Sequence, residues 1–387
     1  MKKIAIILLP LLFTMTLAGQ GINFHKKAWN DLKSMAMTEN KFLFVDCYTD
    51  WCGWCKVMDQ KTFSDPEVIK FMNDKFISAK IDMEKGQGID LAMKYRVTGF
   101  PSYLIFSPEG KLVYKTLGYQ KVPDFLKNLN NSITPGLQHL YNGISDELEL
   151  NFPEFYINAF AGNGKRMWPD SIIIDSFFRT ETNWFSEVSF SVLSRFDVPD
   201  TVNSFFLKNI EQYRYLYSID TDDKISGMIY KMMSEATKNK DMELAGEAFS
   251  MIDLYIKEDK NEIKESYMLK FLSETSDWKN FAATFQKILN KDGYKNPEMI
   301  NNYAWDIYKK CDDPDVVSMA TDWMKKVIEM DPQYMFLDTY AALLYKNKNY
   351  PEAEIYARKA IKTGKKNKED IKETKELLDK IKKELKK

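Results

Sequence analysis

Two cysteines three residues apart, Cys52 and Cys55, constrain this chain most strongly, because they closely follow an apolar run that ends in Val45. A buried strand that runs through a polar loop into a helix N-terminus produces this pattern. At a helix N-terminus the unsatisfied N–H groups and the dipole stabilise an anion, so the first thiol ionises more readily than a free cysteine with its pKa of ~8.5. We therefore predict that Cys52 is a nucleophile and that Cys55, one helical turn away, resolves a mixed disulfide on it.

Two separated motifs, one at residues 45–56 around the cysteine pair and one at residues 97–106 around Pro101, resemble those of the thioredoxin superfamily. The family's active-site segment has a Val-Asp pair and then Trp-Cys-Gly-x-Cys-Lys, matched here by Val45, Asp46, Trp51, Cys52, Gly53, Cys55 and Lys56. Residues 97–102, followed by the apolar residues 103–106, look like the family's cis-proline loop and next strand. The resemblance covers about residues 22–133 and implies an α/β thioredoxin-like fold, in which helices flank a central mixed sheet. Trp54 departs from the proline that is usual in the family, which leaves the redox potential open.

The resemblance also implies roles for residues around the cysteine pair. Asp46 is similar to the buried family aspartate that helps to move a proton from the second cysteine; a strand-end aspartate without this role is the alternative. Pro101 is expected to be cis and to shape a substrate groove where the Phe100 backbone meets an extended segment, and an ordinary turn is the alternative. The other predicted substrate contacts are Trp51, Gly53 and Trp54. For the two tryptophans, packing against the domain body is the alternative.

The four cysteines are too few for a disulfide-stapled scaffold. The other residues able to complete a zinc site are too scattered to suggest one: Cys47, Cys311, His25 and His139. Lys56 stands where haem attachment needs a histidine, and we expect it to be a solvated helix lysine, with assistance to thiolate formation as the alternative. Cys47 is expected to be a buried apolar filler facing away from Asp46. We predict no metal and no cofactor besides a redox-active Cys52–Cys55 disulfide.

Residues 1–19 predict a secretory signal peptide. Lys2 and Lys3 precede an apolar run at residues 4–12, and small residues suited to cleavage follow. The run is too short to span a membrane, and Gln20 stands where a lipoprotein would carry its cysteine. We expect an exported protein of a bacterial periplasm, with no membrane attachment beyond the signal; an uncleaved anchor is the alternative. The formal net charge of -1 suggests no nucleic-acid partner.

Apolar spacing from residue 29 onwards predicts the elements of residues 20–133 in order. Strands are expected from residue 42 and at 76–81, 102–106 and 112–117, and helices at 29–37, 89–95 and 122–129. After the cysteines we expect a helix that is broken near Ser64-Asp65-Pro66, with Asp65 capping its continuation.

The sequence Thr134-Pro135-Gly136 predicts a domain boundary, beyond which helical spacing dominates. Residues 134–266 form a helical region without an assigned role. In residues 267–387 an offset of 33 pairs Ala320 with Ala353, and residues 340–361 resemble a tetratricopeptide repeat. Residues 278–289 are a third, weaker copy, and residues 365–387 are expected to cap the stack.

These features predict an exported thiol-disulfide oxidoreductase acting on protein disulfides. Its expected partners are exported client proteins with thiols or disulfides and a redox partner protein. The sequence does not choose between the reductase direction and the oxidase or isomerase direction. The alternative is a helical-repeat binding or scaffold protein in which the thioredoxin-like domain is secondary.

Overall fold

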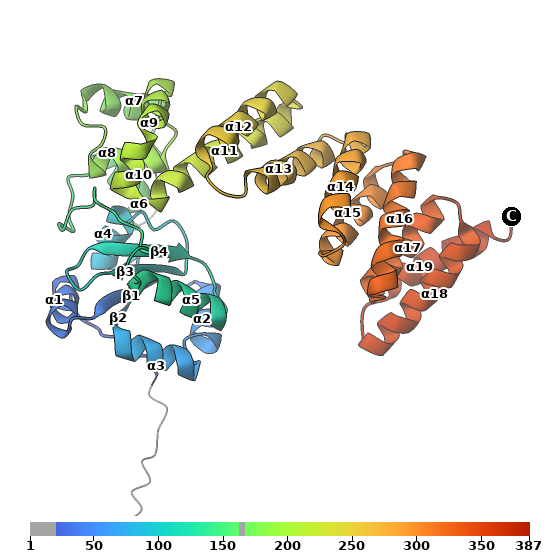
Figure 1. Cartoon of the computed structure of the whole chain (residues 1–387), viewed down its shortest axis with the longest axis horizontal. Helices are drawn as coiled ribbons and strands as arrows, with labels where there is room; N and C mark the ends of the chain where they lie inside the picture. Colours follow the sequence, from blue (N-terminus) through green and yellow to red (C-terminus); the bar gives the residue numbers. More distant parts are fainter. Residues whose placement is uncertain (1–20, 162–166) are drawn as a thin grey trace, which may run out of the picture. The chain divides into compact units, whose positions relative to one another are not determined.

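The computed structural model describes residues 21–161 and 167–387 (Figure 1). The predicted signal peptide at 1–19 lies outside the described residues. The chain divides into two compact units between Lys224 and Ile225, and each is described by itself below. Among the described residues, no helix combines the length and the apolar character needed to cross a membrane.

A mixed four-stranded sheet lies at the centre of the first unit, with strand order β2-β1-β3-β4 (Figure 1). Its strands are β1 (Phe42–Tyr48), β2 (Phe76–Asp82), β3 (Ser102–Phe106) and β4 (Leu112–Leu117). β1 pairs in parallel with β2 and antiparallel with β3, and β3 pairs antiparallel with β4. This order of strands confirms the predicted thioredoxin-like fold.

Five helices cover the two faces of this sheet: α1 (Trp29–Glu39), α2 (Gly53–Lys61), α3 (Pro66–Lys75), α4 (Gln87–Lys94) and α5 (Val122–Ile133). Because side chains alternate along a strand, Leu43, Val45 and Cys47 face the core under α1 and α4, whereas Phe44 faces the core under α2, α3 and α5. The predicted break before α3 is present, and the Asp65 side chain accepts two backbone N–H groups there. Cys47 is fully buried, as expected.

Among the described residues, the six helices that come next after α5 belong, wholly or in part, to the same compact unit as the sheet. They are α6 (Glu154–Phe160), α7 (Ser171–Thr180), α8 (Glu187–Arg195), α9 (Asp200–Lys208), α10 (Ile210–Tyr217) and α11 (Ile219–Asn239), which continues into the second unit. The unit therefore extends past the boundary predicted at residues 134–136. Tyr141 is buried in the core under α1 and α4. Of the partly buried residues that pack against that core, three lie after α5: Ile144, Leu148 and Ile219. A turn does follow α5, but the chain folds back and completes the core.

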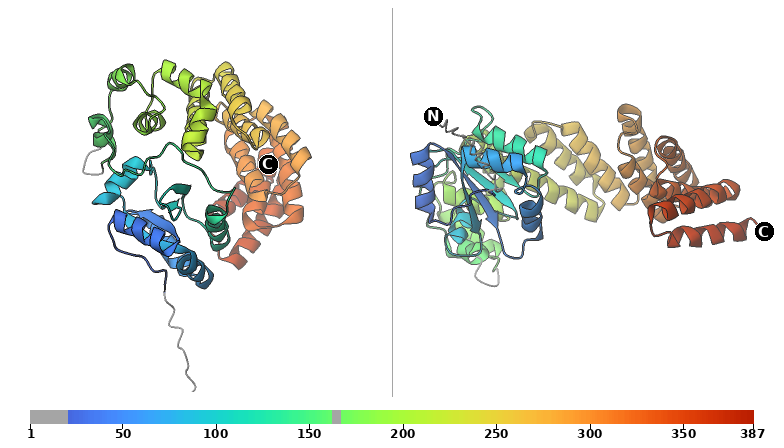
Figure 2. Two further views of the ribbon diagram at one scale, coloured as in Figure 1. Left: turned by 60° about the vertical axis from the view of Figure 1, so that its left-hand side comes forward. Right: turned by 90° about the horizontal axis from the view of Figure 1, so that it is seen from below.

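The second unit is helical throughout its described residues. Its helices are α12 (Met242–Tyr255), α13 (Lys260–Glu274), α14 (Trp278–Asp292), α15 (Pro297–Lys310), α16 (Pro314–Met330), α17 (Tyr334–Lys346), α18 (Tyr350–Asn367) and α19 (Lys372–Glu384). Successive helices from α15 to α19 pack against one another (Figure 2). Ala320 of α16 and Ala353 of α18, the pair at the offset of 33, are both fully buried. The likeness to tetratricopeptide repeats stays a prediction.

Candidate active site

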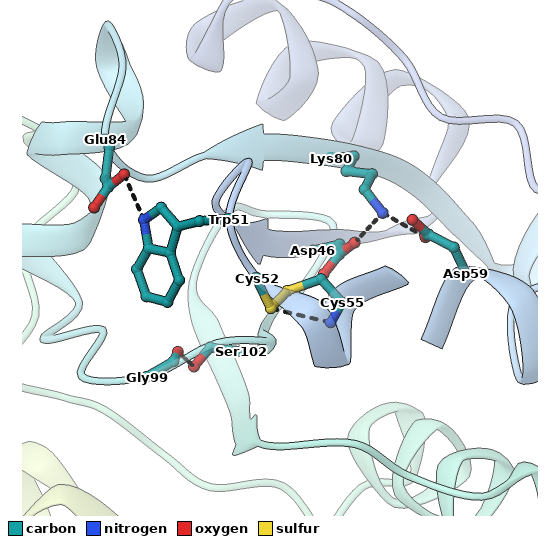
Figure 3. Close-up of a disulfide and its surroundings, with 9 residues drawn as sticks. All are labelled: Asp46, Trp51, Cys52, Cys55, Asp59, Lys80, Glu84, Gly99 and Ser102. Atoms are coloured by element: carbon teal, nitrogen blue, oxygen red, sulfur yellow. Dashed lines mark hydrogen bonds and ion pairs between the residues drawn. A yellow bond between two sulfur atoms is a disulfide. The ribbon is translucent and has the colours of Figure 1, made fainter. Parts of the chain in front are cut away.

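Cys52 and Cys55 form a disulfide at the N-terminus of α2 (Figure 3). Their Cα atoms are 5.4 Å apart, and both residues are buried. Cys52 is the N-cap residue, and its Sγ atom accepts a hydrogen bond from the backbone N–H of Cys55 at 3.0 Å. After reduction, this N–H and the helix dipole would stabilise a thiolate on Cys52.

Asp46 is the fifth of the seven residues of β1, and Figure 3 shows its side chain in the immediate surroundings of the disulfide. Only 1% of the residue is exposed. Its Oδ2 atom lies 3.0 Å from Nζ of Lys80, the residue opposite it on the parallel strand β2. Lys80 also forms an ion pair with Asp59 of α2, which is exposed. Asp46, Lys80 and Asp59 therefore form a continuous series of ion pairs between the region of the disulfide and the surface.

Burial raises the pKa of Asp46 to about 6, although the charge and hydrogen bond of Lys80 act to lower it. For Lys80, burial acts to lower the pKa, but Asp46 and Asp59 outweigh it, so the pKa is raised and the side chain stays cationic. A carboxyl group that titrates near pH 6 can accept and release a proton under physiological conditions. Asp46 is thus suited to receive the proton of a neighbouring thiol.

We expect Asp46→Asn to stabilise the oxidised protein at pH 8 but not at pH 4. Because its pKa is raised from 3.8 to about 6, the folded state binds more protons than the unfolded state between these values, and stability falls as pH rises through them. Above pH 6, ionised Asp46 therefore lowers the free energy of unfolding by about 3 kcal/mol, because each unit of pKa shift corresponds to about 1.4 kcal/mol. Urea unfolding at both pH values measures the difference.

The matched control is Asp59→Asn, which removes the exposed partner of Lys80 and should leave the pH dependence nearly unchanged. Equal stability of Asp46→Asn and the wild type at pH 8 would show that ionised Asp46 carries no burial cost.

Two exposed tryptophans flank the disulfide. Trp51 is 65% exposed and Trp54 is 60% exposed. The Trp51 indole donates a hydrogen bond to Oε2 of Glu84 at 2.9 Å, and its ring meets that of Phe100 edge-on, with centroids 5.8 Å apart. Trp54 stacks on Tyr119 at 5.6 Å. Each tryptophan therefore packs against an aromatic neighbour of the domain and still presents apolar surface to solvent, and its contact with a substrate stays a prediction.

The peptide bond between Phe100 and Pro101 is cis, as the resemblance implied. The Pro101 carbonyl accepts a hydrogen bond from the N–H of Gly118 at 2.8 Å, and Ser102 Oγ donates to the Gly99 carbonyl at 2.7 Å (Figure 3). Pro101 is buried and Phe100 is partly exposed. The contact between the Phe100 and Trp51 rings joins this loop to the cysteine segment.

Two other residues of the predicted cysteine motif, Gly53 and Lys56, are exposed to solvent. Gly53 is exposed, and a Cβ atom there would meet nothing within 4 Å, so the approach to the disulfide is open at this point. Lys56 is exposed on α2. Within residues 21–161 and 167–387, no group of three or more potential metal ligands comes together.

Sequence reasoning missed four residues of the site: Asp59, Lys80, Glu84 and Tyr119. Only Lys80 had a usable signal, because pairing the two predicted parallel strands in register places it opposite Asp46. The other three reach the site through the folding of helix and loop segments, for which no local pattern exists.

Comparisons with known proteins point to the same part of the chain. Residues 17–149 match the family described as "Protein of unknown function, DUF255" (Thioredox_DsbH). The thiol:disulfide interchange protein DsbD of Campylobacter jejuni is 32% identical over 102 residues, 26% of this chain and 18% of that protein. A protein disulfide-isomerase of Zea mays is 22% identical over 169 residues, 44% of this chain and 30% of that protein.

Among solved structures, a thioredoxin from Thermus thermophilus is 23% identical, with a TM-score of 0.28. That alignment covers 30% of this chain and 91% of the thioredoxin. The chain spans less than a third of the length of the two curated relatives.

Proposed function

We propose that this chain, in which residues 22–133 form a thioredoxin-like domain, is an exported thiol-disulfide oxidoreductase that exchanges disulfides with client proteins. The observation that carries the proposal is the disulfide at the N-terminus of α2, with a buried carboxyl group of raised pKa beside it. Relatives named for thiol:disulfide interchange and for disulfide isomerisation support the same chemistry.

In the reductase direction, the Cys52 thiolate attacks one sulfur of a client disulfide. A bond forms between Cys52 and that sulfur, and the other client sulfur leaves as a thiolate and takes a proton from solvent. Asp46 then accepts the proton of Cys55, and the Cys55 thiolate attacks Cys52 Sγ. The second client sulfur leaves, so the client ends as a dithiol and the protein as the Cys52–Cys55 disulfide. The oxidase direction runs the same steps backwards.

Reduction of insulin by dithiothreitol, with and without the purified full chain, tests this activity. We expect the chain to accelerate precipitation of the insulin B chain at catalytic concentration. An unchanged rate would contradict the proposal. Measuring the reduction potential of the pair against glutathione then decides which direction the exchange favours.

We propose that the exposed faces of Trp51 and Trp54 contact an extended client segment beside the disulfide. Trp54→Ala should raise KM for insulin about tenfold, because a buried aromatic contact at an interface contributes more than about 1 kcal/mol. Exchange with a small aromatic disulfide reagent should change less than twofold, since such a reagent needs no extended contact. Stopped-flow kinetics with both substrates measures the two effects.

Trp168→Ala is the matched control, because Trp168 is 62% exposed in the first unit but lies in the segment before α7. It should leave KM for insulin and exchange with the small reagent unchanged. An equal effect of Trp54→Ala on insulin and on the small reagent would assign Trp54 to the chemistry of the thiols instead of to client binding.

Export and a redox partner complete the proposal. The positively charged start and short apolar run of residues 1–19 support secretion. A redox partner protein is needed because each turnover leaves the pair in the opposite redox state. Fractionation of cells that carry the full sequence, followed by mass spectrometry of the mature N-terminus, tests the export.

A further inference from the structure

The loop of residues 95–101, which joins α4 to β3 and contains Pro101, is anchored at its start by side chains. Two carbonyl oxygens accept hydrogen bonds from helices of the region after residue 133: that of Met93, at the end of α4, and that of Val97, in the loop. The Tyr156 hydroxyl donates to Met93 at 3.0 Å, and Arg195 Nη2 donates to Val97 at 2.8 Å. The end of the loop is fixed separately, by the N–H of Gly118 on the Pro101 carbonyl.

Arg96 is the residue of this loop with the most interactions. It is 3% exposed, and its guanidinium pairs with Asp220 of α11, with Nε and Nη2 at 2.9 and 2.8 Å from Oδ2. Nη1 donates to Ser191 Oγ of α8 at 3.2 Å. The guanidinium carbon also lies 5.1 Å from the ring centroid of Phe190 and 5.6 Å from that of Tyr217.

The backbone of Arg96 is left-handed, with φ of 51°. A non-glycine residue adopts this conformation at a cost of order 1 kcal/mol, and it persists where the surroundings overdetermine it. The side chain of Arg96 contacts Asp220, Ser191 and two aromatic rings, all from helices that follow residue 133, and Nη1 also donates to the Lys94 carbonyl at 3.3 Å. The helices after residue 133 therefore supply most of the side-chain contacts that hold this left-handed residue, which lies five residues before Pro101.

The buried and partly buried cations around this loop pair with carboxylates of the same helices. Lys94 is fully buried and pairs with Glu187 of α8 at 2.9 Å. Lys115 of β4 shares Asp220 with Arg96 at 3.1 Å, and its Nζ also donates to the Arg96 carbonyl at 3.3 Å. Three cations of the sheet domain thus face two carboxylates of the helical region, which ties the loop to α8 and α11.

We propose that Arg96 is a positioning residue, through which Asp220 and the helices α6, α8 and α11 hold the cis-proline loop in the orientation that receives a client segment. The inference rests on the proposed function, because it deepens the account of the same site. The helical region up to residue 224 acts here as a support for the groove. Loss of the support should weaken client binding while the reactivity of the Cys52–Cys55 pair stays as it is.

Asp220→Asn in the full chain keeps the shape of the side chain and removes the charge that holds Arg96. Arg195→Gln is the second variant, and it removes the donor to Val97 from a partly exposed side chain. We expect each to raise KM for insulin five- to twentyfold. The reduction potential and the rate with a small disulfide reagent should stay within twofold. Asp220→Glu should restore part of the affinity.

Asp222→Asn is the matched control, since Asp222 lies on the same helix and pairs with Arg214 instead. It should leave KM unchanged. Folded Asp220→Asn and Arg195→Gln proteins with a wild-type KM would overturn the proposal, as would loss of folding in both, because the contacts of Asp220 and Arg195 would then serve only stability. Absence of exchange in the wild type would instead contradict the proposed function and is seen before any variant is made.

Discussion

Cys52→Ser is expected to reduce disulfide exchange to the rate of buffer alone, whereas Cys55→Ser is expected to accumulate mixed disulfides with clients. Only Cys52 stands at the N-cap of α2, where the Cys55 N–H and the helix dipole stabilise its thiolate. Cys55 lies inside the first turn, and its Cα atom is 5.4 Å from that of Cys52 in the disulfide, which places it to attack the sulfur of Cys52 (Figure 3). Insulin reduction measures the first effect, and non-reducing gels of the Cys55→Ser protein measure the second.

Cys311→Ala is the control for a general effect of losing a thiol. Cys311 is a buried free cysteine at the end of α15 in the second unit, and its loss should leave exchange unchanged. Residual exchange in Cys52→Ser above the buffer rate would mean that another thiol carries the reaction. Failure of Cys55→Ser to trap any client would mean that resolution does not depend on Cys55.

The fold of residues 22–133 could be predicted because its signals are local or lie in one motif. Short, continuous apolar runs mark the central strands, Asp65 and Pro66 mark the start of α3, and the spacing of Cys52 and Cys55 marks the start of α2. The cis peptide bond before Pro101 could be predicted from the family resemblance alone, because nothing in the residues around Pro101 requires that isomer.

The support for the cis-proline loop could not be predicted, because its partners are far apart in sequence. Arg96 and Asp220 are separated by 124 residues. In sequence, Lys94 and Arg96 look like solvated charges at the end of a helix, since charged residues are rarely fully buried unless they are paired. Only the folded chain supplies the carboxylates that make their burial possible.

Contacts between residues far apart in sequence also explain why the domain boundary predicted at residues 134–136 differs from the structure. Pro135 and Gly136 do produce a turn, and Gly136 has a φ of 85° that suits glycine. A turn ends an element, but a domain ends only where few contacts cross the boundary. Here Tyr141 re-enters the core of the sheet domain.

Cutting the chain after residue 133 is expected to destabilise the sheet domain severely. The cut removes Tyr141 and its neighbours from the core, and each buried side chain of this size contributes about 1.5–3 kcal/mol. It also removes Glu187 and Asp220 from buried cations of the sheet domain. The loss is therefore of the order of 5 kcal/mol or more, close to the whole stability of a small domain. Urea unfolding of a fragment 21–133 measures it.

The matched control is a fragment 21–240, which ends just after α11 and keeps every helix of the first unit. We expect this longer fragment to unfold in one cooperative transition and to reduce insulin at the rate of the full chain, because all the groups that hold the disulfide and the cis-proline loop are present. A fragment 21–133 as stable as 21–240 would show that the buried ion pairs and Tyr141 contribute nothing net to the sheet domain. Equal instability of both fragments would show that the second unit is needed for the first to fold.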